Sequence, residues 1–138
     1  MLVRIFVSSR EESFYDLIAT LTHEIARLPI TIATIVPEGI GEEELLEIAA
    51  RQSFDLAVLF LNNILYSSGR RERLADDSVA LVQKMARLFL KPIIGVYGWP
   101  DSPDYPSRIL AAGATEVFQA PFKCEQMQQA IKRCTNIW

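Results

Sequence analysis

The most distinctive hydrophobic pattern is an unbroken run in the middle of the chain. Asp55 is followed by six apolar residues, from Leu56 to Leu61. The run is too short to span a membrane, and it lacks the helical alternation of apolar and polar positions. It predicts a strand buried on both faces, as in a parallel sheet covered by helices. Because such sheets bind ligands beyond the carboxyl ends of their strands, the residues from Phe60 to Asn63 are expected to decide the function.

The rest of the chain alternates between strand-like and helix-like segments. Four further segments are short and rich in apolar or β-branched residues: 2–7, 30–36, 92–97 and 116–120. Five segments space their apolar residues as amphipathic helices do: 13–28, 41–52, 78–90, 105–112 and 123–135. This alternation predicts a parallel sheet with helices on both faces, joined by right-handed crossovers. A longer connection, 65–77, carries the cluster from Arg70 to Arg73, which forms either an exposed loop face or a contact for an acidic partner.

The composition is that of one folded domain covering residues 1–138. Half of the residues are hydrophobic and 22% are charged, which allows a buried core without disulfides or metals. A net charge of −3 argues against a nucleic-acid-binding surface. Cys124 and Cys134 lie about 15 Å apart along one predicted helix, too far to bridge, so reduced thiols in a cytoplasmic protein are expected. Neither a signal peptide nor a transmembrane helix is predicted, and no membrane partner is expected.

Two motifs in the last third of the chain carry a family resemblance. Residues 91–98 read KPIIGVYG, and residues 111–122 read AAGATEVFQAPF. They resemble the KPII-x-LTA and AAGA-x-x-(F/Y)-(L/I)-x-KPF motifs of the receiver domain of bacterial response regulators, and the order of elements matches over nearly the whole chain. The resemblance implies an α/β fold of the flavodoxin-like (CheY-like) type. This is a doubly wound parallel sheet of five strands in the order 2-1-3-4-5, between two layers of helices.

The same resemblance locates the positions at which receivers bind metal and phosphate. Receivers hold Mg²⁺ with an acidic pair just after the first strand, where this chain has Ser8 and Ser9. They accept phosphate on an aspartate at the end of the third strand, where this chain has Phe60, or Asn62 if the register slips by two. Mg²⁺ needs anionic oxygen ligands, and neither a benzyl ring nor an amide is an adequate nucleophile toward phosphorus.

Two further receiver positions are also substituted. The threonine or serine that senses the phosphoryl group is replaced by Tyr97. The lysine before the proline that follows the last strand is replaced by Ala120, ahead of Pro121, which the resemblance implies to be cis. Without lysine and metal, nothing offsets the charge of a phosphoryl group. The chain is therefore expected to be a pseudo-receiver: not an enzyme, without a cofactor or metal, and independent of phosphorylation.

The resemblance also implies a surface for protein partners, spanning residues 108 to 132. Six polar side chains of this stretch are expected to point outward: Arg108, Gln119, Lys123, Gln126, Gln129 and Lys132. The expected partner is a signalling protein or a second copy of the chain, as in a homodimer.

Two other interpretations of the sequence remain open. The first is a flavodoxin-like domain that binds a small molecule or nucleotide, or is an enzyme, with its site among these residues: Ser8, Ser9, Arg10, Asn62, Tyr97 and Trp99. The loop after the first strand lacks the glycines that let a backbone wrap phosphate, which argues against it. The second is a domain cut from a longer regulator. Phe60 itself either caps the core or lines a dry pocket.

Overall fold

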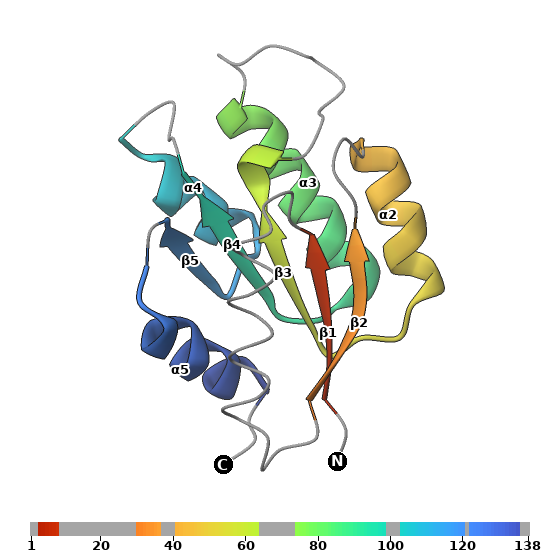
Figure 1. Cartoon of the computed structure of the whole chain (residues 1–138). Helices are drawn as coiled ribbons and strands as arrows, with labels where there is room; N and C mark the ends of the chain where they lie inside the picture. Colours follow the sequence, from red (N-terminus) through yellow and green to blue (C-terminus); the bar gives the residue numbers. More distant parts are fainter. Residues whose placement is uncertain are drawn as a thin grey trace.

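Five parallel strands form the centre of the protein. The computed structural model describes residues 3–8, 30–36, 41–63, 74–98, 103–120 and 122–135. The strands are β1 (Val3–Ser8), β2 (Ile30–Val36), β3 (Leu56–Phe60), β4 (Ile93–Tyr97) and β5 (Glu116–Gln119). Their order in the sheet is β2-β1-β3-β4-β5, and all pairs are parallel, as expected for the flavodoxin-like fold. The carboxyl ends of all the strands therefore lie at the same end of the sheet (Figure 1).

Helices cover both faces of the sheet. They are α2 (Glu42–Arg51), α3 (Leu74–Phe89), α4 (Tyr105–Ala112) and α5 (Cys124–Thr135), and a short 3-10 turn, η1 (Leu61–Asn63), follows β3. Figure 1 places α2, α3 and α4 on one face and α5 on the other. The helix predicted over 13–28 lies outside the described residues. Among the helices that are described, none combines the length and apolar character needed to cross a bilayer.

The alternation of side chains along β3 divides the core into two parts. Ala57 and Leu59 belong to one buried cluster, together with apolar residues of α2, α3 and α4; we call it the α2–α3–α4 core. Leu56, Val58 and Phe60 belong to a second cluster beneath α5, which we call the α5 core. Successive residues of a strand point to opposite faces, so a run of apolar residues is what a doubly covered strand requires.

One helix boundary differs from the prediction. Helix α3 begins at Leu74, whereas the sequence predicted a start at Ser78. Serine often caps a helix, but Ser78 lies inside this one, fully buried, where its Oγ accepts a hydrogen bond of 2.9 Å from the hydroxyl of Tyr105. The hydrogen bond from Tyr105 of α4 thus explains how a buried serine is accommodated inside the helix.

Candidate functional site

The predicted receiver positions lie together at the carboxyl ends of β1, β3 and β4. Ser8 pairs with Leu59, which precedes Phe60. Phe60 pairs with Val96, which precedes Tyr97. Residues 8, 60 and 97 therefore lie next to one another at the carboxyl ends of adjacent strands, although they are far apart in the sequence. Ser9 and Pro121 lie outside the described residues, as do Arg10 and Trp99 of the alternative ligand site.

The side chain of Phe60 is part of the hydrophobic core. It is 6% exposed and belongs to the α5 core together with Val58 and Val96. Ala120, at the position predicted to correspond to the receiver lysine, packs against the same cluster. Hydrocarbon therefore occupies the position predicted to correspond to the phosphoacceptor, and the interpretation of Phe60 as a core cap fits this burial.

Tyr97 lies on the opposite face of the sheet, in the α2–α3–α4 core. Its side chain is 5% exposed, and its ring packs against that of Tyr105 with centroids 4.9 Å apart and planes inclined at 56°. Tyr105 in turn donates its hydroxyl hydrogen to Ser78 on α3. The end of β4 is thereby joined to α4 and α3 by buried contacts. Nothing local in the sequence identified Ser78 as the partner of Tyr105.

Hydrogen bonds from backbone and side-chain amide groups connect the strand ends at this site. The Oδ1 atom of Asn62 accepts a hydrogen bond of 2.5 Å from the backbone N–H of Gly98. The Nε2 atom of Gln119 donates to the carbonyl oxygen of Gly98 at 3.5 Å. The N–H of Ala120 donates to the carbonyl oxygen of Tyr97 at 2.8 Å. These bonds join η1, β4 and β5, so the polar groups of Asn62 and Gln119 here connect one strand end to the next.

The described residues at this end of the sheet do not fit the Mg²⁺ ion that receivers hold. Positions 8, 60 and 120 are Ser, Phe and Ala, and none of these residue types supplies a carboxylate. Within the described part of the chain, no group of three or more His, Cys, Asp or Glu residues is arranged to bind a metal. Mg²⁺ binds through carboxylate and other hard oxygen ligands.

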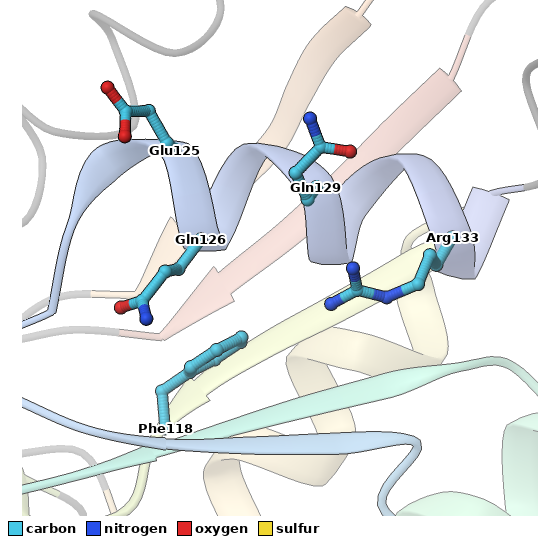
Figure 2. Close-up of a pocket in the computed structure, with 5 residues that line it drawn as sticks. All are labelled: Phe118, Glu125, Gln126, Gln129 and Arg133. Atoms are coloured by element: carbon cyan, nitrogen blue, oxygen red, sulfur yellow. The ribbon is translucent and has the colours of Figure 1, made fainter.

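A groove lies on the predicted partner surface, between β5 and α5. It has a volume of about 330 Å³ and is lined by Phe118, Glu125, Gln126, Gln129 and Arg133. Figure 2 shows the ring of Phe118 below α5, across from Gln126 and Arg133. The sequence predicted outward positions for Gln126 and Gln129 but missed the other three. Phe118 remains half-buried because β5 is an edge strand, and a strand's place in the sheet is a tertiary property.

A salt bridge fixes α5 to the start of β5. The guanidinium of Arg133 donates two hydrogen bonds to Glu116, from Nη2 at 2.5 Å and from Nε at 3.1 Å. The bond from Glu116 raises the pKa of Arg133. The thiol of Cys134 lies 3.8 Å from the same carboxylate. Burial, followed by the charge of Glu116, raises the pKa of Cys134 to about 11, so the thiol stays protonated at neutral pH.

The other predicted interface residues have different surroundings. Arg108 forms an ion pair with Asp76, so on α4 it is directed toward α3. Lys123 and Gln119 are exposed, and Lys132 is half-buried. The N–H of Lys123 donates to Oε1 of Gln126 at 3.2 Å, which satisfies a backbone donor at the start of α5.

Comparison with solved structures identifies the fold as that of response regulator receiver domains. A CheY-like receiver domain protein from Methanospirillum hungatei is similar with a TM-score of 0.72 and 18% identity, over 99% of this chain and 95% of that chain. A response regulator from Thermotoga maritima gives a TM-score of 0.72 and 12% identity, over 99% of both chains. NtrX from Brucella abortus matches 99% of this chain with 27% of its own, at a TM-score of 0.70 and 16% identity. No protein-family model and no curated protein matches the sequence.

Proposed function

We propose that this chain is a receiver-like signalling module of a two-component-type system that works through protein contacts and without aspartyl phosphorylation. The observation that carries the proposal is the burial of Phe60 at the position that corresponds to the phosphoacceptor. Phosphoryl transfer to a receiver needs a nucleophilic carboxylate and a cation to offset the developing charge. Phe60 and Ala120 supply neither, so the proposed module is not an enzyme.

The proposed output surface is formed by α4, β5 and α5. Gln119, Lys123, Gln126 and Gln129 are exposed there, and the groove above Phe118 gives the surface a partly apolar centre. Apolar centres with polar rims are typical of protein interfaces. We propose a cytoplasmic signalling protein or a second copy of the chain as the partner, with Arg108 and Lys132 at the margins.

Phosphorylation of the intact protein is the decisive test. The protein is incubated with acetyl phosphate and Mg²⁺, and its intact mass is measured alongside a receiver domain that has the usual acidic residues. We expect a phosphoryl adduct on the control domain and none on this chain. A stable adduct on this chain, removed by hydroxylamine as an acyl phosphate is, would refute the proposal.

A thermal-shift screen separates this proposal from a ligand-binding flavodoxin-like domain. We expect the melting temperature to stay the same with flavins and nucleotides at micromolar concentration. Any ligand that binds the folded state alone raises the melting temperature by mass action, so a shift of several degrees would favour the ligand-binding alternative.

A further inference from the structure

The solvent side of α5 carries two rows of polar side chains beside the groove. Figure 2 shows Gln126 and Arg133 directed toward the ring of Phe118. Glu125 and Gln129 are directed away from that ring. All four polar residues are exposed and line the groove. The helix therefore presents polar side chains to solvent over about two turns, next to a half-buried aromatic ring.

The row directed away from Phe118 has opposite charges at its two ends. It runs from Glu125 through Gln129 to Lys132, because residues three and four apart lie on the same side of a helix. We call these three residues the outer row. The charged residues of α5 are Glu125 in its first turn and Lys132 and Arg133 in its last turn. The outer row thus has an acid at one end, an amide in the middle and a base at the other end.

This order of charges is complementary to its own reverse. In a two-fold symmetric contact each pair of residues meets twice, because residue i contacts residue j of the second copy and j contacts i. Two antiparallel α5 helices with the axis beside Gln129 would bring Glu125 of each copy to Lys132 of the other. Both contacts then join opposite charges.

The middle of the outer row also suits a two-fold axis. A residue beside the axis faces the same residue of the second copy. The amide of Gln129 both donates and accepts hydrogen bonds, so two identical amides can pair with each other. A carboxylate or an ammonium group at this position would instead face its own charge, which is unfavourable. The uncharged centre is therefore compatible with a second copy of the same surface.

The charges at the ends of α5 have a local effect as well. An acid in the first turn and bases in the last turn stabilise a helix through its dipole. That effect acts within one chain and predicts no self-association. Arg133 is hydrogen-bonded to Glu116 of the same chain. Lys132 is therefore the base whose charge can be reversed without breaking that salt bridge.

We infer that the outer row is the contact between two copies of this chain, whose α5 helices pack antiparallel about a two-fold axis beside Gln129. Glu125 of each copy pairs with Lys132 of the other, and the second helix covers the groove above Phe118. The inference rests on the proposed function, because it names a second copy of the chain as the partner at the proposed output surface.

Sedimentation of the wild-type protein tests for the dimer. We expect the fraction of dimer to increase with protein concentration. Added salt should lower that fraction, because salt screens the paired charges at the ends of the outer row. Leu110→Ala, at an exposed leucine of α4, is the control variant and should dimerise as the wild type does.

A charge swap tests the antiparallel arrangement. Glu125→Lys places two lysines together at each contact, and Lys132→Glu places two glutamates together. Each variant alone should dimerise at least about tenfold more weakly than the wild type. In an equimolar mixture, both contacts of the mixed dimer join opposite charges, so the mixture should regain the dimer.

The double variant Glu125→Lys/Lys132→Glu separates the contact from the helix dipole. Its charges are reversed relative to the dipole, so α5 should be less stable toward urea. Both contacts between copies nevertheless remain attractive, so the double variant should dimerise more strongly than either single variant. Circular dichroism shows whether each variant is folded.

Three results would overturn the inference. A wild-type protein that stays monomeric at all concentrations would assign the groove to a different protein. Single variants that dimerise as the wild type does would place self-association elsewhere on the chain. A mixture and a double variant that both stay monomeric would exclude the antiparallel arrangement. All three leave the proposed function standing, since the mass measurement of a phosphoryl adduct tests that separately.

Discussion

The end of β3 shows how one side chain decides the chemistry of a fold. A carboxylate at position 60 would need water, metal or cationic neighbours, because an unpaired buried charge is very costly. Phe60 needs the opposite surroundings, and Val58 and Val96 of the α5 core provide them. The proposed function rests on this burial, because a buried phenyl ring offers none of the groups that phosphoryl transfer requires.

Truncation of this ring tests its role in the core. We expect Phe60→Ala to lower the free energy of unfolding by about 3 kcal/mol, from lost burial and the cavity left behind. Leu88→Ala, at a 64% exposed side chain, should cost less than about 1 kcal/mol. Urea titrations of both variants measure the difference. Equal losses would mean that Phe60 is not part of a packed core.

The thiol of Cys134 predicts a dependence of stability on pH. Its pKa is raised from 9.0 to about 11 in the folded protein, so the folded state binds more protons than the unfolded state between these values. Stability from this group is therefore complete below pH 9 and is lost as pH rises toward about 11.

Urea unfolding on both sides of that pH window provides the measurement. The wild-type protein should lose more stability across it than Cys134→Ala, in which the thiol is absent. The comparison cancels the contributions of lysines, tyrosines and the other cysteine. Parallel losses in the two proteins would show that burial and Glu116 do not hold the proton on Cys134.

Among the elements, α4 depends most on a precise end. Gly113 has a φ of 128° at its C-cap, and its N–H donates to the carbonyl oxygen of Leu110 at 3.1 Å. A Cβ atom at this position would lie 2.8 Å from the Cβ of Ala86 on α3. Gly113 directly follows the helix predicted over 105–112, and a glycine with positive φ is a common end of a helix. The close approach to α3 is an additional constraint.

Alanine substitutions at Gly113 and at Gly98 test how much the surroundings of each glycine contribute to stability. Gly113→Ala should lower the free energy of unfolding by about 2 kcal/mol, because it adds both strained φ and contact with Ala86. Gly98→Ala is the control, since its Cβ would meet only Asn62 Oδ1, at 3.9 Å. That variant should change stability by less than about 1 kcal/mol. Similar effects at the two positions would contradict the packing of α4 on α3.

At the scale of the whole molecule, the fold is that of receiver domains, and the described positions predicted to correspond to their phosphorylation site are Ser8, Phe60, Tyr97 and Ala120. Phe60 packs in the α5 core and Tyr97 packs in the α2–α3–α4 core. Both faces of the sheet are therefore packed at the carboxyl ends of β3 and β4. The proposed function therefore requires a partner surface that works without a change of state.

A phosphoryl mimic tests the state of the whole domain. Beryllofluoride with Mg²⁺ stabilises a folded protein only if it binds that state preferentially. We expect the melting temperature of this protein to change by less than about 1 °C, whereas a receiver with its acidic residues should melt higher. A rise of several degrees would show that the edge of the sheet still accepts an anion and metal.

Local patterns were sufficient to predict the five strands and the helices from α2 to α5, apart from the start of α3. The strand order came from the family resemblance. The spacing of apolar residues along the chain predicts helices and strands. Tertiary structure alone decided the bond from Tyr105 to Ser78 and the groove above Phe118. Each joins residues far apart in the chain, and a periodic pattern does not identify which distant side chains will meet.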